Sequence, residues 1–199
     1  MLKYIVSFDL SLNHGGFCIL GNRGKLLSFN HSSVDLKISQ LKDNRLLRSE
    51  FVIESLFDKA ENFLLSNYDY PSTYAVVIEG FSFASRSNNI ADIGISYGLL
   101  IGKFLYAMEY TPSDISLKIS PKTVKKFATG NGNADKFDVI NALKTPTKAR
   151  FEKYINEPKN KIFMHESKSV ILSDLADAYF LGQYYFSTKL IDNNKNQPI

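Results

Sequence analysis

Four acidic residues lie where a chain of strands and helices could bring them together. Asp9 ends the first apolar run, Glu79 ends a later one, and Asp174 and Asp177 lie three residues apart in a helical pattern. Crowded carboxylates repel one another unless cations neutralise them, and Mg²⁺ and Mn²⁺ prefer such oxygen ligands. These acids therefore predict a divalent-metal site for phosphodiester chemistry, in which two ions about 4 Å apart activate water and stabilise the leaving oxygen.

Each acid also has a purely structural interpretation. Asp9 could cap a turn, Glu79 could pair with a lysine, and Asp174 and Asp177 could favour a helix start through the macrodipole. The structural interpretation is weaker for Asp9 and Glu79 taken together, because a buried strand that ends in an unpaired carboxylate incurs a desolvation cost.

Composition bounds the class of protein. A chain of 199 residues, 44% of them hydrophobic, suits one domain with a substantial core. The single cysteine, Cys18, excludes an internal disulfide and gives redox catalysis no support. The uncharged stretches are too short to span a bilayer, so we expect a cytosolic protein with no membrane partner.

Positive charge is concentrated in one segment of the chain. Residues 118–168 hold 12 of the 24 Lys and Arg residues but only 5 of the 20 Asp and Glu residues. Such segregation favours a polyanionic partner, because phosphate contacts release condensed counterions. Lysine-rich surfaces are common, so charge alone leaves nucleic acid and an ordinary solvated surface equally open.

The elements that must position the acids follow from hydrophobic periodicity. Three short runs separated by glycine turns at 13–16 and 21–24 predict an antiparallel meander. The continuous apolar run 73–80 is typical of a central strand buried on both faces and parallel to the first. A further strand is expected at 114–120, and helices are expected near residues 43–66, 89–108, 121–128, 137–143 and 172–186.

This order predicts an α/β fold with a mixed five-stranded sheet flanked by helices. We expect one nuclease domain over residues 1–188, with a basic loop or helical insertion at 145–170 and a flexible tail at 189–199. Gly94, Gly98 and Gly102 recur every fourth residue of the second long helix. This stripe suggests close packing on the sheet, with a dimer contact as the alternative.

Four sequence blocks then resemble the RuvC-type Holliday junction resolvases of the ribonuclease H-like superfamily. They are SFDLSLNHGGFCIL, VVIEGFSF, ISPKTVKKFATGNGNADKFDV and LSDLADAYFLG, and they occur in the family's order. The resemblance covers most of the chain except residues 30–70 and 145–170, and VKKFATGNGNADK is its most specific part.

The resemblance implies a homodimeric, Mg²⁺-dependent endonuclease, with Mn²⁺ as a substitute, that nicks two strands of a four-way DNA junction symmetrically. It places Asp9, Glu79, Asp174 and Asp177 on the catalytic, metal-binding acids. It also places Lys136, with Lys125, against the DNA backbone near the scissile phosphate, where a cation stabilises developing charge. Contacts with branched DNA are expected from Lys122, Lys125, Lys126, Phe81, Phe83 and Arg86. The implied location is the cytoplasm of a bacterial or phage-infected cell.

Two departures from the family bear on the substrate. Ser82 stands where the family commonly places an aromatic wedge, and its neighbours Phe81 and Phe83 could stack on bases or simply pack. The stretch between Lys136 and Asp174 is also longer than usual. A phage-type relative with broader substrates, such as flap, fork or RNA–DNA hybrid, therefore stays open, as does a non-catalytic junction-binding module.

Other motifs do not suggest competing chemistry. His14, His31 and His165 lack paired metal-ligand spacing and are expected at the surface, with His14 close to the predicted site. The turn at 129–134 lacks the ending of a nucleotide-binding P-loop, so a DNA contact or a simple helix entry explains it better. The chain is too short for an actin-like kinase, and no nucleotide cofactor is expected.

Overall fold

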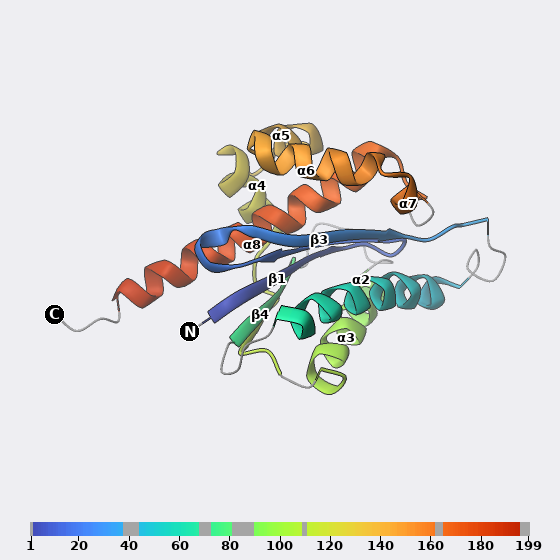
Figure 1. Ribbon diagram of the computed structural model, residues 1–199, viewed down its shortest axis with the longest axis horizontal. Helices are drawn as coiled ribbons and strands as arrows, with labels where there is room; N and C mark the ends of the chain where they lie inside the picture. Colours follow the sequence, from blue (N-terminus) through green and yellow to red (C-terminus); the bar gives the residue numbers. More distant parts are fainter. Residues whose placement is uncertain are drawn as a thin grey trace.

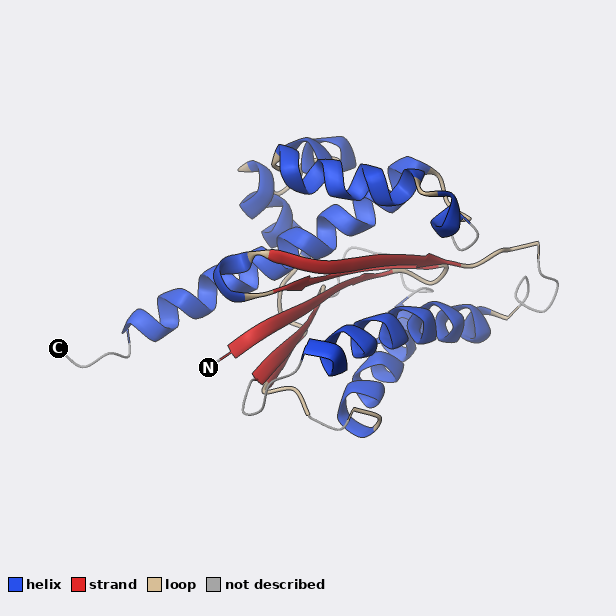
Figure 2. Ribbon diagram, viewed as in Figure 1, coloured by secondary structure: helices blue, strands red, loops and turns tan. Residues whose placement is uncertain are grey.

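Five strands form one mixed sheet in the order β3-β2-β1-β4-β5 (Figures 1 and 2). The computed structural model describes residues 2–37, 44–67, 73–80, 90–108, 111–161 and 165–195. The strands β1, β2 and β3 are antiparallel neighbours, whereas β4 lies parallel to both β1 and β5. The predicted mixed sheet is thereby confirmed. Its strands are β1 (Leu2–Leu10), β2 (His14–Leu20), β3 (Leu26–Ser33), β4 (Thr73–Ile78) and β5 (Asp114–Ser116).

Helices cover both faces of the sheet (Figure 1). One face carries α2 (Arg45–Asn67) and α3 (Ile90–Tyr106). The other face carries α8 (Lys168–Lys195), which lies chiefly over β1 and β2 and is itself covered by smaller helices. These are α4 (Pro121–Thr129), α5 (Lys136–Ala142), α6 (Thr145–Asn156) and α7 (Pro158–Lys161), and a short 3-10 turn, η1 (Asn22–Gly24), links β2 to β3.

Strand alternation sorts side chains between two cores. Tyr4, Val6 and Phe8 of β1 pack against α2 and α3, whereas Ile5 joins the core under α8. In β4, Val76 and Ile78 likewise face α2 and α3, and Val77 faces α8. Because side chains alternate with a period of two, Asp9 and Glu79 fall on the α8 face.

Two glycines allow α8 to lie close to the sheet. A Cβ on Gly16 of β2 would come within 3.2 Å of the Asp174 backbone, and one on Gly182 would come within 2.7 Å of Ser7 Oγ. By contrast, a Cβ on Gly94, Gly98 or Gly102 would meet nothing within 4 Å. The expectation that this stripe packs on the sheet is therefore wrong; small residues permit close approach, but no neighbour among the described residues uses it.

The basic segment folds as helices, which decides between the predicted alternatives. Phe151 and Ile155 of α6 are buried in the core under α8. Arg150 Nη1 donates to the Leu26 carbonyl at 2.7 Å, which ties α6 to the edge strand β3. Arg150 thus has a structural role and is not a free DNA contact. The helix α8 continues to Lys195, past the expected domain boundary at 188 and into the segment predicted as a tail.

None of the helices among the described residues is both long enough and apolar enough to cross a membrane.

Candidate active site

Asp9 and Glu79 stand at neighbouring strand ends. Phe8 of β1 is in register with Ile78 of β4, so the acids that follow them are adjacent. The backbone around Glu79 is held by three hydrogen bonds: Glu79 N–H donates to Phe8 O at 3.3 Å, Gly80 N–H donates to Ile119 O at 2.7 Å, and Tyr97 Oη donates to Glu79 O at 2.5 Å. Tyr97, on α3, was not predicted as part of the site, since nothing in its sequence context points to a strand end.

The helix α8 brings Asp174 and Asp177 to the same end of the sheet. Ser7 Oγ donates to the Ala178 carbonyl at 2.7 Å, and Cys18 Sγ donates to the Leu175 carbonyl at 3.6 Å. These contacts hold the helix against β1 and β2 at the residues that directly follow the two acids. The Cys18 thiol is buried, and burial raises its pKa well above the usual value.

Electrostatics show that the four acids form one cluster. Burial, followed by the charges of Glu79, Asp174 and Asp177, raises the pKa of Asp9 well above its usual value. Burial and Asp177 raise the pKa of Glu79 to about 8, and burial and Asp174 raise that of Asp177 to about 6. Such mutual destabilisation of the charged forms is what a bound cation would relieve. The charges of all four acids that the sequence singled out thus act on one another at one end of the sheet.

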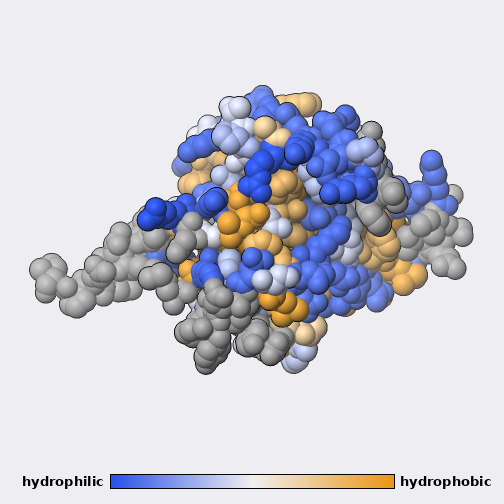
Figure 3. Space-filling model, viewed as in Figure 1, coloured by the Kyte–Doolittle hydropathy of each residue, from blue (hydrophilic) through white to orange (hydrophobic). Residues whose placement is uncertain are grey.

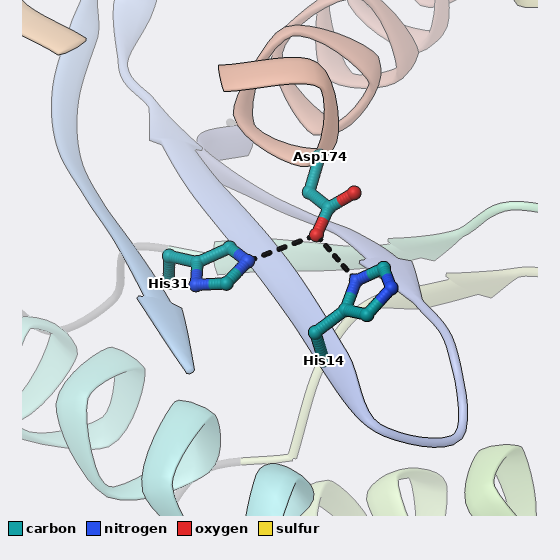
Figure 4. Close-up of side chains that lie close together, drawn as sticks. All are labelled: His14, His31 and Asp174. Carbon is teal, nitrogen blue, oxygen red and sulfur yellow. Dashed lines mark hydrogen bonds and ion pairs between the residues drawn. The ribbon is translucent and has the colours of Figure 1, made fainter. Parts of the chain in front are cut away.

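Asp174 differs from the other acids. Although burial opposes its ionisation, hydrogen bonds from His14 and His31 lower its pKa below the usual value. His14 Nδ1 lies 2.6 Å from Asp174 Oδ2, and His31 Nε2 lies 2.9 Å from the same oxygen (Figure 4). Among the residues that the structure describes, these three form the one group of His, Cys, Asp or Glu whose ligand atoms all lie within 4.8 Å.

The expectation that His14 and His31 are surface residues is wrong. The His31 side chain is fully buried, and that of His14 is only 22% exposed. The β2–β3 pairing sets His31 opposite Gly16 and His14 opposite Ser33, so both rings lie on the α8 face. Paired-ligand spacing along the chain could not reveal them, whereas the register of the predicted hairpin could have done so. His165 lies apart from them, with Nδ1 3.8 Å from Asp35 Oδ2.

Two of the predicted lysines face the acids. The charge of Lys136 lowers the pKa of both Asp9 and Asp177, and that of Lys125 lowers the pKa of Glu79 and Asp177. Lys136 begins α5 directly after the Asp135 N-cap, whose side chain accepts from Asp138 N–H in a capping box. The helix start therefore sets the position of this lysine.

The remaining predicted contacts lie elsewhere. Lys122 and Lys126 line a separate shallow pocket of about 590 Å³ with Phe127 and Tyr184. Gly130 caps the end of α4 in the left-handed conformation at φ 81°, so this turn ends one helix before the next begins after Asp135. The aromatic candidates and one arginine fall outside the described residues: Phe81, Phe83 and Arg86.

Comparisons with known proteins agree with this architecture. No family model matches the sequence, and no curated protein matches it either. The mixed five-stranded sheet flanked by helices defines an α/β fold of the ribonuclease H-like class. Within that class it is similar to the solved structure of Thermus thermophilus RuvC, with a TM-score of 0.52 and 15% identity over 94% of this chain and 97% of that chain.

A second solved structure, T. thermophilus RuvC in complex with Holliday junction substrate, matches with a TM-score of 0.51 and 13% identity, over 94% of this chain and 96% of that chain. The RuvC-type fold predicted from the four sequence blocks is thereby confirmed.

Proposed function

We propose that this chain is a metal-dependent endonuclease that resolves four-way DNA junctions by paired symmetric nicks. One observation carries the proposal: four carboxylates from β1, the end of β4, and α8 gather at one sheet end, with Lys125 and Lys136 close enough to alter their pKa values. The similarity to a RuvC structure that holds a Holliday junction substrate supports branched DNA as the partner.

The donor set suits hard divalent cations. Asp9, Glu79, Asp174 and Asp177 offer carboxylate oxygens, and burial with neighbouring carboxylates raises the pKa of three of them, an imbalance that a bound cation would relieve. These four residues would hold Mg²⁺ or Mn²⁺, with two ions expected in each site. When bound, such ions supply Lewis-acid stabilisation of the attacking and leaving oxygens.

The protein's own groups would orient the phosphate and move the proton. Lys136 and Lys125 lie on the α4–α5 side of the acids and would contact the phosphate backbone, offsetting charge that grows in the transition state. As the alternative to a role as metal ligand, Asp177 is suited to accept the proton of the attacking water, because burial and Asp174 raise its pKa to about 6. The mainly hydrophilic surface over α5 and α6 fits a DNA partner (Figure 3).

A homodimer fits the opposite face of the molecule. The helices α2 and α3 expose apolar side chains there, beside the open glycine stripe and a pocket of about 440 Å³ lined by Ile53, Gly98, Leu99 and Tyr106. The exposed side chains are Leu46, Phe51, Ile95, Leu99, Leu105 and Tyr106. Burial of such a surface against a second copy would place two active sites on one junction. A cytoplasmic location in a bacterial or phage-infected cell follows from this function.

The decisive experiment compares substrates and one variant. Purified protein is incubated with a mobile four-way junction, fork, flap, linear duplex and RNA–DNA hybrid, with and without Mg²⁺, and the cut positions are mapped. We expect paired nicks in the junction that require Mg²⁺, and loss of nicking in Asp9→Asn with junction binding retained. Equal cutting of all substrates would contradict the junction-resolvase proposal and support a nuclease with broader substrates. Tight junction binding without any cutting would support a non-catalytic junction-binding module.

The dimer has its own test. Leu99→Glu places a charge on the exposed α3 face, and analytical ultracentrifugation should then show a monomer where the parent chain sediments as a dimer. Paired nicks should become unpaired. A parent chain that sediments as a monomer at micromolar concentration, with or without junction DNA, would contradict the dimer proposal.

A further inference from the structure

The two histidines contact a single oxygen of Asp174. His14 Nδ1 and His31 Nε2 lie 2.6 and 2.9 Å from Oδ2. Figure 4 shows the second oxygen, Oδ1, pointing away from both rings. The rings are nearly parallel, with centroids 6.2 Å apart and an interplanar angle of 19°, and each presents its nitrogen edge to the carboxylate. One oxygen is thus used twice within the protein and the other is left for a ligand.

The fold makes this arrangement specific. The histidines come from adjacent strands of the β2–β3 hairpin, and Asp174 comes from the helix above it. Gly16 of β2 pairs with His31 of β3. Because Gly16 has no side chain, the Asp174 backbone can lie close to it; a Cβ at this position would be only 3.2 Å from that backbone. The His31 backbone is held in turn, since its N–H donates to Asn30 Oδ1 at 2.9 Å. The His31 ring, which is fully buried, is confined between the hairpin and α8.

The contacts are those of hydrogen-bond donors. Both distances match charge-assisted N–H···O⁻ bonds. His31 Nδ1 is buried without a hydrogen-bond partner among the described residues. If Nε2 of His31 bound a cation, the ring proton would have to sit on Nδ1, where it would be buried with no acceptor. A proton on Nε2 instead donates to Asp174 and leaves Nδ1 as an unpaired acceptor rather than an unpaired N–H donor, so the contact with the carboxylate favours the Nε2 tautomer.

We propose that His14 and His31 are positioning residues, which hold Asp174 by Oδ2 so that Oδ1 is presented to a divalent cation. The inference rests on the proposed metal-dependent function and adds residues to it that touch no substrate. A carboxylate otherwise rotates freely about its last side-chain bond, and two donors on one oxygen fix that rotation before the cation arrives. The side chains of Asp9 and Glu79 have no comparable donors among the described residues.

The geometry of asparagine and glutamine provides a sharp test. An asparagine amide nitrogen falls near the position of a histidine Nδ1, and a glutamine amide nitrogen falls near that of Nε2. His14→Asn and His31→Gln therefore keep the donor, whereas His14→Gln and His31→Asn misplace it. The two substitutions at each site serve as matched controls for polarity.

The readout is Mn²⁺ binding to the full chain without DNA, measured by titration calorimetry after treatment with a chelator. We expect His14→Asn and His31→Gln to bind within about 3-fold of the parent chain, and the misplaced variants to bind about 10- to 100-fold more weakly. Thermal unfolding in chelator verifies the fold of each variant. If both His31 variants unfold, the two variants of His14, which is less buried, decide the outcome.

Three results would overturn the inference. If all four variants bound Mn²⁺ as tightly as the parent chain, the histidine contacts would be merely structural. If all four bound Mn²⁺ equally weakly, affinity would not depend on the position of the donor. A Mn²⁺-coordinated nitrogen in pulsed electron paramagnetic resonance, lost on substitution of either histidine, would make the histidines ligands.

The proposed function fails in a different way. If the parent chain binds Mn²⁺ with the expected pattern of variants but nicks no DNA, the nuclease proposal fails and the positioning role survives. If the parent chain binds no Mn²⁺ at all, both proposals are overturned.

Discussion

Asp9 and Glu79, the strand half of the candidate site, contrast with Asp174 and its two histidines, the helix half. Asp177, also on α8, has a raised pKa like the strand acids. Asp9 and Glu79, at the ends of β1 and β4, have raised pKa values because burial and neighbouring acids disfavour their charge. Asp174, on α8, is at least as buried, yet His14 and His31 lower its pKa. The protein thus stabilises the Asp174 carboxylate with hydrogen-bond donors of its own, whereas the charges of Asp9 and Glu79 would be stabilised by a bound cation.

The largest expected effect is on nicking, where the two halves should behave alike. Glu79→Gln and Asp174→Asn each remove a proposed ligand, so each should slow Mg²⁺-dependent nicking of a four-way junction by about 1,000-fold or more. Single-turnover rates at saturating protein measure the loss. Glu50→Gln, an exposed acid on α2, serves as the matched control and should keep the parent rate. A Glu79→Gln variant with parent activity would remove the strand half from the site.

Stability without metal should separate the halves. The pKa of Glu79 is raised from 4.5 to about 8, so between these pH values the folded chain holds a proton that the unfolded chain has released. Folding stability should therefore fall as pH rises through this window. Glu79→Gln should remove the fall and raise the melting temperature in chelator by several degrees at pH 8, with little change at pH 5.

Asp174→Asn should act with the opposite sign. Because the pKa of Asp174 is lowered, its ionised form adds stability above the usual value of 3.8, and that stability is lost only as pH falls through the folded value. The variant should lose about 1–3 kcal/mol of unfolding free energy, and so have a lower melting temperature, throughout pH 5 to 8. Calorimetric scans in chelator measure both variants. A shift of the same sign in both would abolish the contrast between the halves.

Lys136 should have an intermediate effect, on the strand half in particular. Its charge lowers the pKa of Asp9 and Asp177 without a direct ion pair to either among the described residues. Lys136→Met should slow single-turnover nicking by about 10- to 100-fold while junction affinity changes little. Lys153→Met, on the exposed side of α6, is the control for loss of one positive charge. A loss confined to affinity would make Lys136 a general phosphate contact.

The smallest effect concerns the distance between helix and sheet. Gly16→Ala would place a Cβ 3.2 Å from the Asp174 backbone, so we expect it to lift α8 and cost about 1 kcal/mol or more. Gly98→Ala meets open space on α3 and should be neutral or stabilise by up to about 1 kcal/mol through helix propensity. Urea unfolding measures both. Mn²⁺ affinity should fall in Gly16→Ala only, since only that change displaces the helix half.

Periodicity predicted the sheet well because burial on both faces leaves a strong local pattern. The uninterrupted run at 73–80 indicated a central strand parallel to the first, and β4 lies between β1 and β5. The segment 145–170 was ambiguous, because its few apolar residues, such as Phe151 and Ile155, reveal a helix only when α8 is there to bury them. The glycine stripe of α3 gave a wrong prediction of sheet packing for a related reason. The spacing of small residues shows where another backbone could approach, but not whether one does.

The acids and the histidines of the site also differ in how far the sequence could predict their neighbours. Asp9 and Glu79 could be paired from the chain alone, because parallel strands place their ends at one edge of a sheet and alternation selects the face. His14 and His31 became neighbours through the register of a hairpin, and they met Asp174 through the approach of α8 at Gly16.

The linear order of residues was therefore enough to specify the elements, the face on which each strand acid lies, and the helical turn that joins Asp174 to Asp177, since all three depend on local geometry. The partners of Asp174, and so the sign of its pKa shift, arose from contacts between segments more than a hundred residues apart. Such contacts depend on how closely the layers approach, which no local pattern encodes.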